Sequence, residues 1–332
     1  MSEHQKLVEA LLAGDRRAAA GGSPLSHGFL NSALDVAARY AKLEKLVFGN
    51  VRVVYSTASL EVDLAPSGDV VAQGEALAEV ERSRLDLPAG PALELGYLIE
   101  DQGLKIIPRV FPAGSGALGG FFFDDRLGPC ILLNVRASSS AIDYALAHLY
   151  GHYLADYDPY ITTLCGRPDP ELLEDPVELR AHQFALAFLL PRADLETYRD
   201  ALGIGPGDPI SVELVHHLEV YFEIDPEMVF WRLLSLGWID AAGLQTLLAQ
   251  HSSLADGLRA PAQEPAEGTL LPERFIQLVA SAFGKRKLEI EDAARYLGTD
   301  IDEATRILEQ FKYDDTSGRA TKRGNGTARK SR

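Results

Sequence analysis

The chain is short of cysteine, long apolar runs and positive charge, and each shortage excludes a class of protein. Only Cys130 and Cys165 occur in 332 residues. Two cysteines are too few for a disulfide scaffold, so the sequence predicts a reducing compartment such as the cytoplasm. No apolar run reaches the length of a membrane span, and Met1 to Arg17 lack the apolar core of a signal peptide.

Acidic side chains outnumber basic ones by 48 to 32, which gives a formal net charge of -16. Such a surface repels phosphate groups, which argues against general nucleic-acid binding and against docking on anionic lipid. The tail from Thr316 is the exception, because its arginines and lysines lie among Gly, Ser and Thr without an acid. We therefore expect no membrane association and at most weak nucleic-acid contact through this basic tail.

A carboxylate is missing from the most informative motif, Ala147-His148-Leu149-Tyr150-Gly151-His152. Two histidines four residues apart lie on one face of a helix and can bind one metal ion. In a hydrolytic zinc site of this spacing, a Glu after the first His takes a proton from the metal-bound water. Leu149 stands there and cannot accept a proton. Taken alone, the pair is more often two hydrogen-bonded histidines on a helix face.

Apolar periodicity predicts an α+β fold. The predicted helices and strands are helices at 29–48, 73–84, 92–101, 141–155, 176–190 and 212–236 (broken near 225), three short helices within 272–312, and strands at 105–108, 118–123 and 130–134. The turn-rich segment 124–129 indicates that the last two strands are antiparallel neighbours. We expect a small, mostly antiparallel sheet packed on two zincin-like helices, which carry HxxxH and ExxxH, with helical extensions at both ends.

A second helix offers further ligands. Glu178 follows His152 by 26 residues, and a His, His, Glu set with an open position is a common zinc site. Asp156 lies one turn beyond His152 and can orient that histidine from behind. His182 lies one turn beyond Glu178, where it is either a second-shell residue, an extra ligand that closes the site, or a buried polar residue bonded to a carbonyl.

Four motifs follow one another in a recognisable order: Gly119-Gly120-Phe121, then Ile131 to Asn134, then His148 to His152, then Glu178 to Ala185. With these motifs, the chain resembles the ImmA/IrrE family of zinc metallopeptidases over about residues 75 to 240. Many members of that family act on helix-turn-helix repressors in bacterial stress and mobile-element responses.

The resemblance implies that His148, His152 and Glu178 are zinc ligands. The sequence departs from the family pattern at two positions, since Leu149 replaces the catalytic Glu and His182 replaces an Asn. The general base would therefore be absent.

Three functions follow from this pattern. The first is a pseudo-peptidase with a regulatory role, which binds a protein partner such as a helix-turn-helix repressor. An extended peptide would add to a strand edge at Gly119, Gly120 and Phe121, although core packing also explains these residues. The second function is an active zinc endopeptidase that uses Tyr150, Tyr153 or Asp156 as its base.

The third function is a DNA-associated transcriptional regulator. Residues 288–311 have the Ala-x-x-x-Gly rhythm of a helix-turn-helix. Their second helix, however, begins Asp300-Ile301-Asp302-Glu303, which phosphates would repel. The pattern favours a helical packing or dimerisation module.

The resulting division of the chain is a mobile N-terminus (1–25), a helical N-terminal extension (26–74), an ImmA/IrrE-like metallopeptidase domain (75–200), a helical extension (201–256), a linker (257–271), a small helical module (272–313) and a disordered basic tail (314–332).

Overall fold

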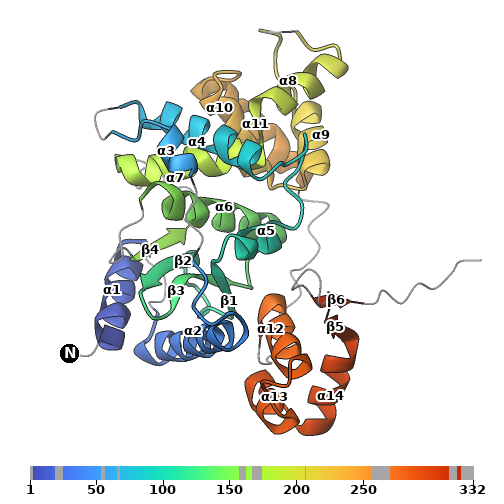
Figure 1. Cartoon of the computed structure of the whole chain (residues 1–332). Helices are drawn as coiled ribbons and strands as arrows, with labels where there is room; N and C mark the ends of the chain where they lie inside the picture. Colours follow the sequence, from blue (N-terminus) through green and yellow to red (C-terminus); the bar gives the residue numbers. More distant parts are fainter. Residues whose placement is uncertain are drawn as a thin grey trace, which may run out of the picture.

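The computed structural model describes residues 3–18, 25–53, 57–65, 68–156, 162–166, 174–205, 207–255, 270–313 and 320–322. A small sheet lies between helices α1 and α2 on one face and helix α6 on the other, with α7 and α4 beyond α6 (Figure 1). The elements are α1 (Glu3–Ala18), α2 (His27–Phe48), α3 (Ala58–Glu61), α4 (Val70–Arg84), α5 (Leu95–Asp101), β1 (Lys105–Arg109), β2 (Ala117–Asp124), β3 (Gly128–Asn134), α6 (Ser139–Ala155), β4 (Thr162–Gly166), α7 (Pro176–Leu189), α8 (Arg192–Ala201), α9 (Val212–Phe222), α10 (Pro226–Ser235), α11 (Ala241–Ala255), α12 (Glu273–Gly284), α13 (Ile290–Leu297), α14 (Ile301–Gln310), β5 (Phe311–Tyr313) and β6 (Ala320–Lys322). The α+β prediction is confirmed.

The sheet has the strand order β1-β3-β2-β4, and two of its three pairings are antiparallel. The predicted hairpin of β2 and β3 forms because Asp124 accepts hydrogen bonds from the backbone of the turn and Gly128 adopts φ 75°. One prediction is wrong. Gly119, Gly120 and Phe121 do not form a sheet edge, because β2 pairs with β3 on one side and β4 on the other. Strand β4 is not among the strands predicted from the sequence.

The two faces of the sheet bury different layers. Phe121 and Ile131 belong to the core that includes α6, whereas Phe122 and Leu132 belong to the core that includes α1 and α2. The prediction of a mobile N-terminus is corrected here, since Glu3–Ala18 is helical. The helical period places Val8, Leu11 and Leu12 on one side of this helix. All three are buried in the core that α1 and α2 share with the sheet.

Close approach of α4, α7 and α6 depends on two glycines. A Cβ on Gly74 of α4 would lie 2.6 Å from the carbonyl oxygen of Arg180 and 2.9 Å from the amide nitrogen of Phe184, both in α7. A Cβ on Gly151 of α6 would lie 2.8 Å from Cδ1 of the Phe184 ring. Only a residue without a side chain lets these helix backbones approach so closely.

The helical extension is fastened to the sheet-bearing domain by a buried arginine. The predicted break near Asp225 separates α9 from α10. From α10, the Arg232 guanidinium donates to both carboxylate oxygens of Glu75 at 2.5 and 2.7 Å and to the carbonyl of Leu190 at 2.8 Å. Arg232 is fully buried, so its charge depends on these partners.

Of the C-terminal helices, α12 packs against α2, and α13 and α14 complete the same apolar core. Tyr40 meets Phe275 edge to face, and Arg274 forms an ion pair with Asp101 at 3.2 Å. Glu100 lies at the same junction and accepts a hydrogen bond from the Tyr40 hydroxyl at 3.0 Å. Burial raises the pKa of Glu100 to about 8, although the positive charge of Arg274 opposes this shift.

Two further sequence predictions concern segments that the structure describes only in part. The predicted linker lies outside the described residues except for residues 270–271. In the predicted basic tail, Ala320–Lys322 forms β6 and pairs with β5, which corrects the prediction of disorder for these three residues. Residues 314–319 and 323–332 lie outside the described part. No helix among the described residues combines the length and apolarity needed to cross a membrane.

Candidate metal centre

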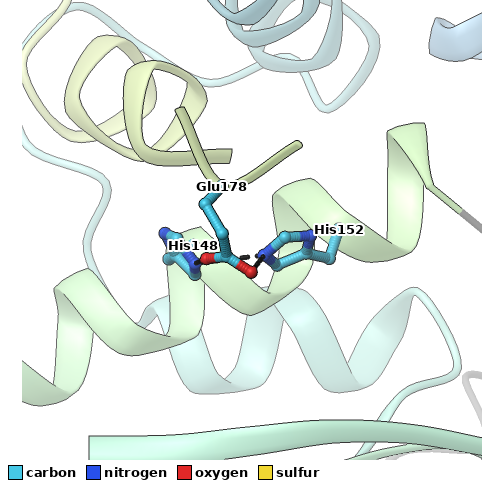
Figure 2. A group of neighbouring side chains, drawn as sticks. All are labelled: His148, His152 and Glu178. Atoms are coloured by element: carbon cyan, nitrogen blue, oxygen red, sulfur yellow. Dashed lines mark hydrogen bonds and ion pairs between the residues drawn. The ribbon is translucent and has the colours of Figure 1, made fainter. Parts of the chain in front are cut away.

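Two helices bring the predicted ligands together. Ser138 is the N-cap of helix α6, and its side chain accepts a hydrogen bond from the Ala141 amide at 3.3 Å. The helix presents His148 and His152 on one face. Helix α7 begins with Asp175 as its N-cap, which places Glu178 in its first turn. Figure 2 shows Glu178 reaching from α7 between the two imidazoles of α6.

The three side chains form a compact donor set. The Nε2 atom of His148 lies 3.2 Å from Oε2 of Glu178, and Nε2 of His152 lies 3.5 Å from Oε1. The two Nε2 atoms are 3.1 Å apart. One ligand atom from each residue lies within 4.8 Å of the others, and both histidines are buried. Two imidazoles and one carboxylate are the donors that zinc accepts in an open site.

The outer side of His152 is held by charged groups. Its Nδ1 lies 3.1 Å from Asp156, which also binds the guanidinium of Arg180. Arg180 in turn donates to the side-chain oxygen of Gln73 at 3.2 Å. Asp156 therefore lies at the Nδ1 side of His152 and does not belong to the donor set.

The outer side of His148 is held by neutral groups. Its Nδ1 lies 3.4 Å from the Tyr144 hydroxyl, and that hydroxyl lies 2.9 Å from Nδ1 of His182. His182 thus contacts Tyr144 and is absent from the donor set, so the structure does not place it as a further ligand. Nothing in the sequence pattern singled out Tyr144, although it precedes His148 by one helical turn and so shares its face.

The electrostatics of the group favour a cation. Burial by itself lowers the pKa of His152, but hydrogen bonds to Asp156 and Glu178 outweigh burial and raise it to about 9. Against its own burial, Glu178 is held by His148 and His152 at a pKa far below its usual range. Burial lowers the pKa of His148, and it lowers that of His182 to about 3, so His182 is neutral.

The residue at the general-base position is fully buried and apolar. Leu149 faces the sheet, where its Cδ1 would lie 3.0 Å from a Cβ on Gly119. The substitute bases considered from the sequence are engaged elsewhere. The Tyr150 hydroxyl donates to Glu81, Tyr153 packs against Phe121, and Asp156 is bound as described above.

A buried HxxxH helix on a small sheet, with a carboxylate from the next helix, defines the class as a metallopeptidase-fold protein. Residues 99–227 match the family model of the IrrE N-terminal-like domain, and they include the sheet, both histidines and Glu178. This part of the chain is therefore an ImmA/IrrE-like domain. A search of curated proteins gives no match.

Proposed function

We propose that this protein is a zinc-binding pseudo-peptidase of the ImmA/IrrE family, which binds a protein partner in a regulatory role. The observation that carries the proposal is the contrast at one site: three well-placed donor side chains lie beside Leu149, which has no proton-accepting atom. A family fold with ligands but without a base fits recognition better than hydrolysis.

Zinc bound in such a site supplies positive charge and polarises a coordinated carbonyl or water. The residues of the chain would divide the remaining work. His148, His152 and Glu178 would hold the ion, and Asp156 would fix the ring of His152 through its Nδ1. No residue described near Leu149 takes the part of the missing Glu. Loss of a positioned general base lowers the rate of such reactions by roughly 10²–10⁴.

Peptide cleavage and metal content test the proposal together. The full-length protein would be assayed on a fluorogenic peptide library with zinc and with a chelator, beside Leu149→Glu and Leu149→Gln. The Gln variant matches Glu in shape but supplies no base. We expect bound zinc in all three and cleavage only by Leu149→Glu. Zinc-dependent cleavage by the wild type at the rate of Leu149→Glu would refute loss of the base.

The partner requires a separate measurement. Calorimetric titration with a purified helix-turn-helix repressor encoded by a neighbouring gene would test the class of partner that the family suggests. We expect binding without proteolysis of the repressor. Absence of binding to repressors of this kind would contradict the proposed partner while leaving the metal site untouched.

A further inference from the structure

A buried hydrogen-bond chain ends at an atom that has no partner. The Nε2 atom of His182 is buried and makes no hydrogen bond to any residue that the structure describes. The other ring nitrogen bonds to Tyr144, which also bonds to His148. A buried polar atom without a hydrogen bond destabilises the folded state, so its presence needs a physical explanation.

We propose that Tyr144 and His182 are positioning residues, which fix the ring and tautomer of His148 for metal binding. This inference rests on the proposed metal site. Nε2 of His148 faces the donor set, and a metal-binding neutral imidazole keeps its single proton on the other nitrogen. The proton therefore lies on Nδ1, which donates to the oxygen of Tyr144.

The direction of the remaining bonds follows from this first one. The hydroxyl of Tyr144, having accepted from His148, donates its own proton to Nδ1 of His182. Because His182 is neutral, its proton lies on Nε2. The His182 ring also contacts Trp231, whose ring is perpendicular to it at a centroid distance of 5.7 Å. In an edge-to-face pair of this kind an N–H of one ring can point toward the π face of the other, which would give Nε2 of His182 a weak acceptor.

The two histidine ligands are thus supported in different ways. His152 has a charged support in Asp156 and Arg180, whereas His148 has a neutral one in Tyr144 and His182. This arrangement is compatible with the Asn that the family pattern has at the position of His182. A side-chain oxygen of Asn could accept from Tyr144 as Nδ1 of His182 does.

Zinc affinity of the full chain, measured by competition with a chromophoric chelator, tests this role without reference to catalysis. We expect Tyr144→Phe to weaken zinc binding about 10- to 100-fold, the usual effect of removing an outer partner of a ligand. Tyr150→Phe is the matched control, since Tyr150 is equally buried on α6 but donates to Glu81. It should keep wild-type zinc affinity.

Variants at His182 separate positioning from simple packing. His182→Ala should weaken zinc binding, whereas His182→Asn should retain affinity because it keeps an acceptor for Tyr144. The double variant Tyr144→Phe/His182→Ala should bind zinc no more weakly than Tyr144→Phe alone, because either change breaks the same chain. If the losses of zinc affinity multiply in the double variant, the proposed hydrogen-bond chain is contradicted. Equal losses of affinity in His182→Asn and His182→Ala would also contradict it.

Histidine tautomers give a second readout. In ¹⁵N-labelled, zinc-loaded protein, long-range ¹H–¹⁵N correlations should place a proton on Nδ1 of His148 and on Nε2 of His182. A proton on Nδ1 of His182 would overturn the proposal, as would wild-type zinc affinity in folded Tyr144→Phe. A wild type that binds no zinc would instead refute the metal site itself, so the two failures are distinguishable.

Discussion

Gly74→Ala should destabilise the fold and weaken the metal site together. The added methyl would lie 2.6 Å from the carbonyl oxygen of Arg180 and 2.9 Å from the amide nitrogen of Phe184. Both atoms belong to the backbone of α7, which cannot yield as a side chain would. Overpacking costs about 1–3 kcal/mol, and we take the upper end here, while the better helix propensity of Ala returns about 1 kcal/mol. The expected net loss is about 2 kcal/mol.

The denaturant midpoint and the chelator competition measure the two effects. Displacement of α7 moves Glu178 and Arg180, so zinc affinity should fall about tenfold or more. Gly96→Ala is the control, because its nearest atom, Cδ1 of Ile106, lies at an ordinary 3.7 Å. It should keep wild-type zinc affinity and leave the free energy of unfolding unchanged or raised by up to about 1 kcal/mol, because Ala favours a helix. Wild-type stability and zinc affinity in Gly74→Ala would refute the close-packing argument.

Three other changes have defined outcomes. Asp156→Asn should weaken zinc binding about 10- to 100-fold in chelator competition, because His152 loses a charged partner; unchanged affinity would remove Asp156 from the site. Arg232→Met should lower the free energy of unfolding by about 1.5–3 kcal/mol, since the partly exposed carboxylate of Glu75 loses its buried partner and keeps only Arg192 at 3.7 Å; a loss below about 1 kcal/mol in urea denaturation would contradict this role. The folded-state pKa of Glu100, about 8, exceeds its ordinary value of 4.5, so stability should fall as pH rises from about 4.5 to about 8. Glu100→Gln should flatten this dependence of stability on pH. An unaltered slope would contradict the raised pKa of Glu100.

Local patterns in the sequence were sufficient for most elements. The serines before α6, Asp175 before α7 and the turn of β2 and β3 act through neighbours in the chain, so their effect can be predicted from residue order. The strand β4 was missed because a pairing partner, rather than its own residues, makes it a strand. Because β4 was not predicted, Gly119 was wrongly predicted to lie on a strand at the edge of the sheet.

The N-terminal helix shows the limit of local patterns in another way. Leu7 to Leu12 give only a short amphipathic signal, and such a segment is stable only if its apolar side finds a surface. In the structure that surface is the sheet face opposite α6, which places Val8 and Leu11 in the core. The packing of α12 on α2 likewise could not be predicted from the spacing of apolar residues, because these helices are far apart in the sequence.

The sequence by itself determined the resemblance to the ImmA/IrrE family, the histidine pair one turn apart on a helix, and the apolar residue at the position of the base. These depend on residue identity and helical period, which are local properties. Only the tertiary structure decided that Glu178 meets both imidazoles, that Asp156 supports one histidine, and that Tyr144 and His182 support the other. Contacts between α6 and α7 depend on how closely two helices pack, and the close approach at Gly151 exists only once the chain is folded.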